Sequence, residues 1–242
     1  MLFPSLNAGI YALAYWTFSD FPDEYRENYQ NKWGLFRWSG TDYRTRPHYT
    51  SFGLITKYLR GPAKVLRTAS NDPFVRAAVM LRESDGAPTV LLVNRNSTTV
   101  QVELDLGVVP VQPLRRYVYD PQRPRPDPFG DLPDPDALVA AAGARLVEEL
   151  PANSQVLLTA AYAATRPPAV IGVAAVPQGE GMRVSWEPTD ADDLCYYRVY
   201  RLVDGRREQV GSTIATAFTD RRGRPGDRYA VVAVDQSGNA GD

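Results

Sequence analysis

Short runs rich in apolar residues, some of which alternate with polar ones, fill the middle of the chain. Six of them follow one another: "FVRAAVMLRE", "TVLLVNRN", "TVQVELDL", "RRYVYDP", "ARLVEEL" and "SQVLLTA". A period of two is typical of strands with one buried face, and turn signals such as Asp85-Gly86 separate the runs. The pattern predicts an antiparallel β-sandwich over residues 62–165, with one short helical turn in "DALVAAAG" at 136–143.

A different pattern occupies residues 1–61. "IYALAYWTF" is a continuous apolar run, as in strands that are buried on both faces. "RPHYTSFGLITKYLRGP" has apolar residues at helical spacing from Tyr49 to Leu59, a first-turn proline at Pro47 and a stop signal at Gly61-Pro62. The pattern predicts a strand at 9–18, a long aromatic loop and a helix at 47–60. Their apolar faces require further neighbours.

The remaining residues, 166–242, follow the stiff linker Arg166-Pro167-Pro168. They contain "GMRVSWEP", "CYYRVYRL", "TAFTD" and "DRYAVVAVDQSGNAG", which resemble a fibronectin type III domain. In this resemblance Trp186 is the buried tryptophan of the second strand, Tyr197 points inward, and Tyr229 is the tyrosine-corner residue. The resemblance also implies that the last strand of the domain is missing, because the sequence stops at Asp242.

Composition and charge argue against several classes of function. The 242 residues carry a net charge of −1 with mixed signs, so no nucleic acid or anionic membrane is expected as a partner. No apolar run is long enough to span a membrane, and "MLFPSLNAGI" lacks the features of a signal peptide. The basic turns "GRRE" and "DRRGRPGDR" are interpreted as solvated surface.

The sequence offers little for nucleophilic or metal chemistry. His48 and Cys195 are the only residues of their types, and they fall in different predicted domains. A Cys/His dyad needs hydrogen-bond contact between the two side chains, so none is expected. One histidine without clustered acids also gives no transition-metal site, and no cofactor is expected.

The opening residues carry a second resemblance. "AYWTFSDF", then "WGLF" at 33–36 and then "RPHYTSFGLITKYLRG" resemble the end of the (β/α)8 barrel of clan A retaining glycoside hydrolases. The family most similar in pattern is family 39, the β-xylosidase and α-L-iduronidase group. There the eighth strand and helix close the barrel, a β-sandwich follows, and some members add a fibronectin-like domain.

This order implies a mainly β chain in three parts. Residues 1–61 are the C-terminal remnant of a barrel, 62–165 the β-sandwich, and 166–242 a fibronectin type III-like domain without its last strand. Retaining glycosidases use two carboxyl groups about 5 Å apart. In this clan they stand at the ends of the fourth and seventh strands, so the resemblance implies that both catalytic glutamates lie upstream and that no residue here is catalytic.

The resemblance therefore implies the C-terminal fragment of a secreted, extracellular glycoside hydrolase. Its expected partners are an oligosaccharide, polysaccharide or glycoside and the missing N-terminal barrel portion of the same protein. A second hypothesis is a non-catalytic carbohydrate- or protein-binding module of two β-sandwich domains, with residues 1–61 as a docking arm.

Sugar-contacting candidates lie where the barrel strand ends, because barrel ligands bind at that face. The resemblance makes Trp16 the floor of a sugar subsite, with Phe18 and Trp33 on its wall. Asp20 is a candidate hydrogen-bond acceptor for a sugar hydroxyl. The alternatives are core packing for the three aromatic residues and an N-cap or a loop salt bridge for Asp20.

Overall fold

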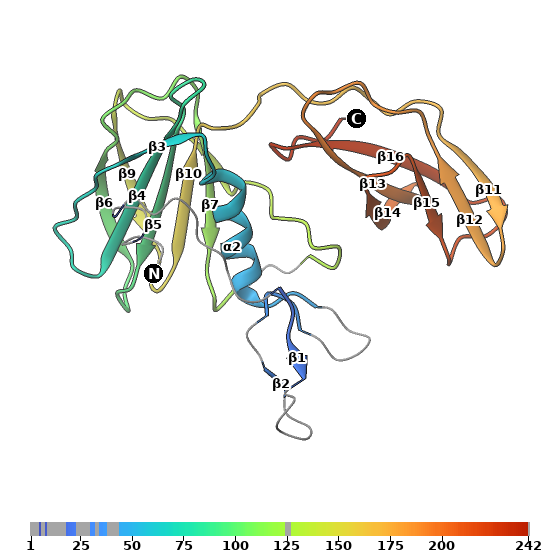
Figure 1. Ribbon diagram of the computed structural model, residues 1–242, viewed down its shortest axis with the longest axis horizontal. Coiled ribbons are helices and arrows are strands. Elements are labelled where there is room, and N and C mark those ends of the chain that lie inside the picture. The colour runs from blue at the N-terminus through green and yellow to red at the C-terminus, as the bar shows by residue number, and fades with distance from the viewer. Residues whose placement is uncertain are drawn as a thin grey trace. The chain divides into compact units, whose positions relative to one another are not determined.

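The computed structural model describes residues 5, 8, 18–22, 30–31, 34–37, 44–123 and 127–241. The chain divides into two compact units, Met1–Ala161 and Tyr162–Asp242. Both are built from antiparallel sheets, and one α-helix of more than one turn, α2 (Pro47–Tyr58), is present in the described part (Figure 1). The prediction of a mainly β chain is confirmed. Over the same residues, no helix is both long and apolar enough to cross a membrane.

The first unit contains a six-stranded sheet and a two-stranded sheet. In spatial order the larger sheet consists of β3 (Ala63–Leu66), β4 (Val75–Arg82), β5 (Pro88–Asn94), β10 (Gln155–Thr159), β7 (Leu114–Tyr119) and β8 (Ala137–Val139). The smaller sheet pairs β6 (Val100–Asp105) with β9 (Arg145–Leu150). All six predicted strands are confirmed. The helical turn predicted at 136–143 is wrong, because this stretch contains the edge strand β8, which pairs with β7.

The core of the sandwich lies between these two sheets. Leu92 pairs with Val156 across β5 and β10, and both side chains are buried, as is Leu158. They pack in one cluster with Leu146 and Leu150 from β9. Strand β9 alternates strictly between exposed and buried positions, which is the pattern that the sequence predicts for a strand with one solvated face.

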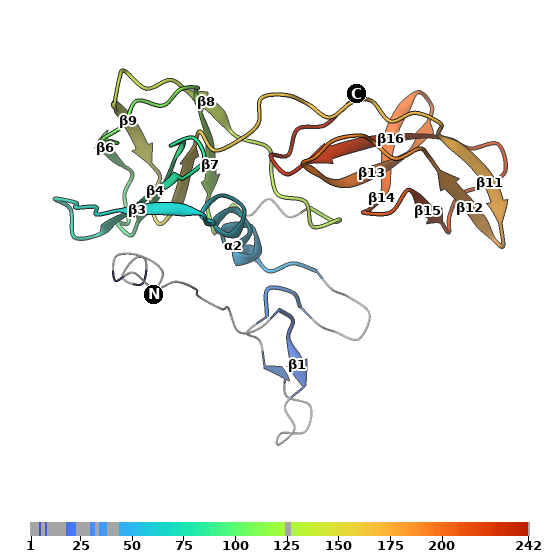
Figure 2. The ribbon, with the colours of Figure 1, turned by 45° about the horizontal axis from the view of Figure 1, so that its top comes forward.

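Helix α2 covers the other face of the six-stranded sheet. Leu54 and Tyr58 pack against Leu91, Leu157 and Tyr117, whose side chains alternate with those of the sandwich core. In both views α2 lies on the opposite side of the large sheet from β6 and β9 (Figures 1 and 2). The hydroxyl oxygens of Tyr58 and Tyr117 are 2.7 Å apart and hydrogen-bonded. Strands β5 and β10 are therefore buried on both faces.

The structure gives the predicted helix a neighbour that the sequence did not name. The sequence predicts that the apolar face of the helix at 47–60 packs against barrel elements. In the structure the side that carries Leu54 and Tyr58 packs against the six-stranded sheet of the sandwich. Pro47 begins the helix as predicted, and Tyr58 ends it two residues earlier than expected. The predicted strand at 9–18 lies outside the described residues except for Phe18.

The second unit consists of two three-stranded sheets. One has the order β11 (Ala174–Gln178), β12 (Gly181–Ser185), β15 (Ala217–Asp220), and the other has the order β14 (Arg206–Thr213), β13 (Leu194–Val203), β16 (Arg228–Asp235). After β16, within the described residues, the chain returns to it through a single bridge between Val234 and Ala240.

The core of the second unit follows the sequence prediction. Trp186 is buried with its ring centroid 5.3 Å from that of Tyr197, in an edge-on contact. Tyr197 and Val199 point inward as expected, and Val231 packs in the same cluster. The hydroxyl of Tyr229 donates a hydrogen bond to Asp220 Oδ2 at 3.0 Å. Assignment of this unit to the fibronectin type III family remains a prediction.

Candidate functional site

Three segments from residues 18–46 meet directly before α2. Strands β1 (Phe21–Pro22) and β2 (Gln30–Asn31) pair with each other, and Phe36 forms bridges with both Ser19 and Thr45. The Asp20 amide donates to the Phe36 carbonyl at 3.0 Å, and the Arg46 amide donates to the Leu35 carbonyl at 2.8 Å. The long loop between residues 20 and 46 is thus closed at its base, and we call this junction the loop base.

A buried ion pair fixes the loop base. Asp20 is 3% exposed, and its carboxylate accepts hydrogen bonds from Arg46 Nη2 at 2.5 Å and Arg46 Nε at 3.3 Å. The amide of Gly34 donates to the same carboxylate at 3.0 Å. Arg46 occupies the N-cap position of α2 and does not cap it, because a guanidinium has no acceptor for the amides of the first turn; the group is directed to Asp20. The structure therefore places Asp20 inside the loop base, in an ion pair.

Gly34 is required by the close approach of backbones at this point. A Cβ atom at this position would overlap the backbone at Ser19 and Asp20 and would stand 2.7 Å from the Phe36 carbonyl oxygen. Any larger residue would push the Gly34 amide away from the Asp20 carboxylate. The glycine thus provides both the space and the third hydrogen bond.

Arg46→Met is expected to destabilise the loop base by about 3–5 kcal/mol, because it leaves the buried Asp20 carboxylate without its cationic partner. Hydrogen exchange of the amides of Gly34, Leu35 and Phe36 measures this effect. The matched control is Arg37→Met, which removes an exposed arginine side chain from the same loop. Equal exchange rates in the two variants would contradict the role given to the ion pair.

His48 lies in the first turn of α2 and is hydrogen-bonded to the backbone of Gly34. Burial lowers the pKa of its imidazole, and the nearby Arg46 lowers it further, while the Gly34 hydrogen bond and Asp20 act in the opposite direction. The neutral imidazole is therefore the form that the folded protein favours.

The stability of the first unit should decline as the pH falls through about 6.5, the ordinary pKa of a histidine. Because the pKa of His48 is lower in the folded state, the unfolded chain binds the proton first, and stability is complete only above that pH. His48 is the only histidine, so its imidazole signals in an NMR titration are unambiguous. We expect a midpoint below 6.5; one above it would contradict the burial of the ring. His48→Gln should remove this part of the pH dependence.

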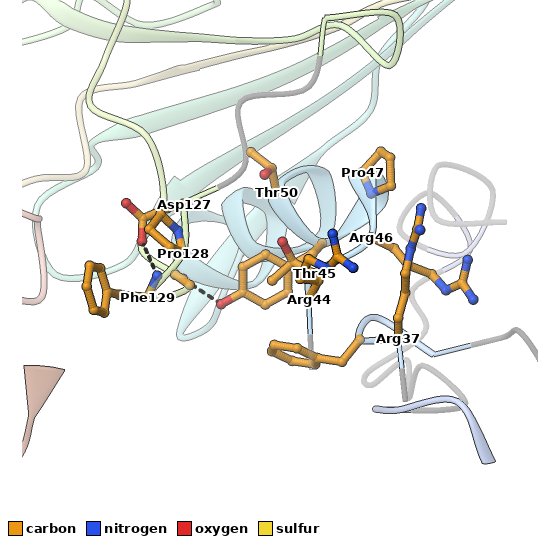
Figure 3. Close-up of a pocket in the computed structure, with 12 residues that line it drawn as sticks. Arg37, Arg44, Thr45, Arg46, Pro47, Thr50, Asp127, Pro128 and Phe129 are labelled. Carbon is orange, nitrogen blue, oxygen red and sulfur yellow. Dashed lines mark hydrogen bonds between the residues drawn. The ribbon is translucent and has the colours of Figure 1, made fainter. Parts of the chain in front are cut away.

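An open cleft of about 620 Å³ borders the N-terminal end of α2 (Figure 3). It is lined by Phe36, Arg37, Arg44, Thr45, Arg46, Pro47, Tyr49, Thr50, Asp127, Pro128, Phe129 and Gly130. The Tyr49 hydroxyl closes one side by donating to the Gly130 carbonyl at 2.7 Å. The rings of Phe18 and Phe36 are 4.7 Å apart and those of Phe36 and Tyr49 are 5.1 Å apart, so an aromatic row leads to the cleft.

The charge of the cleft lining favours binding over acid–base chemistry. Its described lining contains three arginines, of which Arg46 is paired with Asp20, and one acid, Asp127. The Asp127 carboxylate accepts the amides of Phe129 at 2.7 Å and Asp131 at 3.2 Å and so holds the turn. Arg37 and Arg44 are exposed, and a guanidinium presents donors that suit polar and anionic groups. The described lining contains no pair of carboxylates.

The site residues predicted from sequence are only partly visible here. Trp16 and Trp33 lie outside the described residues. Phe18 is 68% exposed and stacks on Phe36 at the edge of the aromatic row. The sequence prediction missed the cleft residues Arg37, Arg44 and Tyr49, although "FRWSGTDYRTRP" concentrates three arginines just before the helix.

The described residues contain no group of three or more histidine, cysteine, aspartate or glutamate side chains that could hold a metal ion. Cys195 is an exposed free thiol.

No protein-family model matches this chain, and no curated protein sequence matches it. Among solved structures, it is similar to the GH30 endoxylanase of Clostridium papyrosolvens C71, with 19% identity over 50% of this chain and 28% of the xylanase and a TM-score of 0.39. GH30 xylanase C of Talaromyces cellulolyticus shows 20% identity over 52% and 27% of the two chains, with a TM-score of 0.42. The structure called FN3tt shows 23% identity over 31% of this chain and 88% of its own, with a TM-score of 0.28.

The chain spans less than a third of the length of these two xylanases. The likeness is confined to part of the fold, and it carries no conclusion about activity. Both xylanases belong to family 30, and the resemblance to family 39 remains a prediction from the sequence.

Proposed function

We propose that this chain is the C-terminal part of a retaining glycoside hydrolase. In this proposal residues 1–61 are the end of the barrel, 62–165 the β-sandwich and 166–242 a fibronectin type III-like domain. The observation that carries the proposal is the attachment of α2. Its Leu54 and Tyr58 face is buried on the sandwich, and its first residues are joined by the Asp20–Arg46 pair to the segment that ends the predicted barrel strand. This attachment is what we expect of a last barrel helix that continues directly into a sandwich domain.

In this proposal the aromatic residues of this region contact the sugar. Trp16, Phe18 and Trp33 are proposed to line the substrate pocket at the carboxyl end of the strand, where ligands bind in barrels of this type. Asp20 is buried and engaged by Arg46, which favours a role in holding the loop base beside the pocket. The nucleophile and the acid/base are assigned to upstream barrel strands, and the whole enzyme is proposed to act outside the cell.

Aryl β-xyloside hydrolysis tests the proposal. The purified 242-residue chain is compared with the same chain extended by the coding sequence that precedes it. We expect no turnover by the chain alone and turnover by the extended protein, which Glu→Gln changes in the added strands should abolish. Turnover by the 242 residues alone, or none by the extended protein on any of a panel of aryl glycosides, would contradict the proposal.

A non-catalytic binding module is the second candidate. The observation in its favour is the cleft beside α2, in which the exposed side chains of Arg37 and Arg44 accompany the aromatic residues Phe36 and Phe129 and no pair of carboxylates is described. An upstream stop codon together with native expression of the 242 residues would support this candidate, and retention on a glycan array would identify its ligand.

A further inference from the structure

The fold of the second unit brings two basic turns together at one end. The hairpin between β13 and β14 carries Arg206 and Arg207, and the segment between β15 and β16 carries "RRGRPGDR". Leu202 of β13 pairs with Arg207 on one side and with Arg228 on the other. Because directly opposite residues share a face, the two arginine side chains flank Leu202, with Cα atoms roughly 10 Å apart. Two stretches that are separate in sequence thus form one surface.

This arginine-rich end consists of six exposed arginines: Arg206, Arg207, Arg221, Arg222, Arg224 and Arg228. Most of the acids at this end are already engaged. Asp220 is buried and accepts hydrogen bonds from Arg201, and Glu208 forms an ion pair with the same guanidinium. Asp227 accepts the amide of Arg224 at 2.8 Å. With Arg201, residues 201–208 and 220–228 contain seven arginines against four acids, Asp204, Glu208, Asp220 and Asp227, so these two segments carry a net charge of +3.

The positive surface continues along the outer face of the β14-β13-β16 sheet. Tyr196, Arg198 and Tyr200 alternate with the buried Tyr197 and Val199, so they lie on the side away from the core. The Arg198 guanidinium donates to the Tyr196 hydroxyl at 3.0 Å and lies 5.7 Å from the centroid of its ring. We call Tyr196, Arg198 and Tyr200 the strip. Arg198 pairs across the sheet with Ser212 of β14 and Val232 of β16, which carry no charge. The half-buried strip is therefore cationic and aromatic.

We propose that this face of the second unit binds an acidic polysaccharide through its carboxylate groups. Guanidinium groups match carboxylates in bidentate geometry, and exposed cations on neighbouring strands attract an extended polyanion over several contacts. Tyrosine rings are flat apolar groups of the kind that pack against sugar rings, and Tyr196 and Tyr200 are half-buried beside the arginines. The choice of a carbohydrate over another polyanion rests on the proposed function, whereas the cationic surface is a property of the described residues.

Binding of the full chain to polygalacturonate, measured by affinity electrophoresis, tests this inference. Arg207→Glu/Arg228→Glu should weaken binding by about tenfold or more, because two attractive contacts become repulsive. Arg95→Glu/Arg183→Glu is the matched control; it makes the same change in net charge at exposed arginines in the first unit and on the other sheet of the second. We expect that control to bind within about twofold of the unchanged chain, and binding to weaken with salt. Arg207→Gln/Arg228→Gln should weaken binding less than the reversal and avoids new repulsion within the fold.

Three results would overturn the inference: no binding of polygalacturonate, equal loss in the control, or stronger binding of an oligothymidylate, which would assign the surface to nucleic acid. Equal binding of unsubstituted xylan would contradict the role of carboxylates. The outcome is separable from that of the hydrolysis assay. If the extended protein hydrolyses aryl glycosides but the chain does not bind polygalacturonate, only this inference is contradicted. If the chain binds polygalacturonate but the extended protein does not hydrolyse aryl glycosides, only the proposed function is contradicted.

Discussion

Asp220→Ala is expected to destabilise the second unit by about 3–5 kcal/mol, the cost of breaking a buried ion pair by removing one partner. Asp220 is 5% exposed and accepts hydrogen bonds from Arg201 Nη1 at 3.2 Å, the Tyr229 hydroxyl at 3.0 Å and the Arg222 amide at 2.9 Å. Without the carboxylate, the Tyr229 hydroxyl and the Arg222 amide lose this acceptor, and the Arg201 guanidinium keeps the Arg222 carbonyl and the more distant Glu208 carboxylate. A loss of this size is a large fraction of the stability of a small domain.

Hydrogen exchange of the amides of β13 and β16 in the full chain measures this loss. The control is Asp192→Ala, which removes an exposed acid from the same unit. Burial raises the pKa of the Tyr229 phenol, and Asp220 raises it further, so the pKa of this phenol should fall in Asp220→Ala if the unit stays folded. Protection equal to that of the control would contradict a structural role for the carboxylate.

Leu54→Ala should destabilise the first unit by about 2–5 kcal/mol, the range for a fully buried leucine whose removal leaves a cavity. Leu54 is 1% exposed and packs against Leu91 and Leu157 of the central strands. Because β5 and β10 are buried on both faces, the loss extends to the whole sandwich. Urea unfolding followed by far-UV circular dichroism measures the change in the free energy of unfolding.

Thr56→Ala is the matched control for this variant, since Thr56 is exposed on the same helix and its hydroxyl donates to the Gly53 carbonyl at 3.1 Å. Its effect should stay within about 0.5 kcal/mol, as for most surface substitutions. If the two variants were equally stable, the packing of α2 on the sheet would contribute nothing to the unit.

The strands of the sandwich could be predicted because their side chains carry the signal locally. In "ARLVEEL" the spacing of Leu146 and Leu150 matches the buried side of β9, whereas Val147 is exposed and Glu148 is buried in an ion pair with Arg116. The prediction from sequence was wrong where pairing with a distant strand determines the secondary structure. "DALVAAAG" is rich in helix formers, yet Ala137–Val139 becomes an edge strand because Leu114 of β7 offers it a partner. Strand β3 was missed because its four residues are too few to show a period.

The covering of the sandwich by α2 shows a second limit. The continuous apolar runs of β5 and β10 indicate strands that are buried on both faces, but they do not say what covers the second face. The helix signal at Pro47 was clear, whereas its packing partner depends on contacts such as Leu54 with Leu157, about a hundred residues apart in sequence. Local patterns cannot encode such a contact.

The candidate site also combines features that local sequence indicates with contacts that it does not. A salt bridge was one of the alternatives for Asp20, but its partner Arg46 is 26 residues away and no periodicity connects the two. The arginines that line the cleft are visible as a cluster in the sequence, yet only the fold places them opposite Asp127 and Phe129. The roles proposed for Trp16 and Trp33 remain predictions from the resemblance.

Hydrogen exchange of helix α2 in the full chain tests the attachment of the helix most directly. If α2 is part of the sandwich unit, the amides of its second half, from Leu54 to Tyr58, should exchange with the same opening free energy as those of β5 and β10 and should lose protection together with them in urea. Exchange of these amides at the rate of an unstructured peptide, with β5 and β10 still protected, would contradict the account.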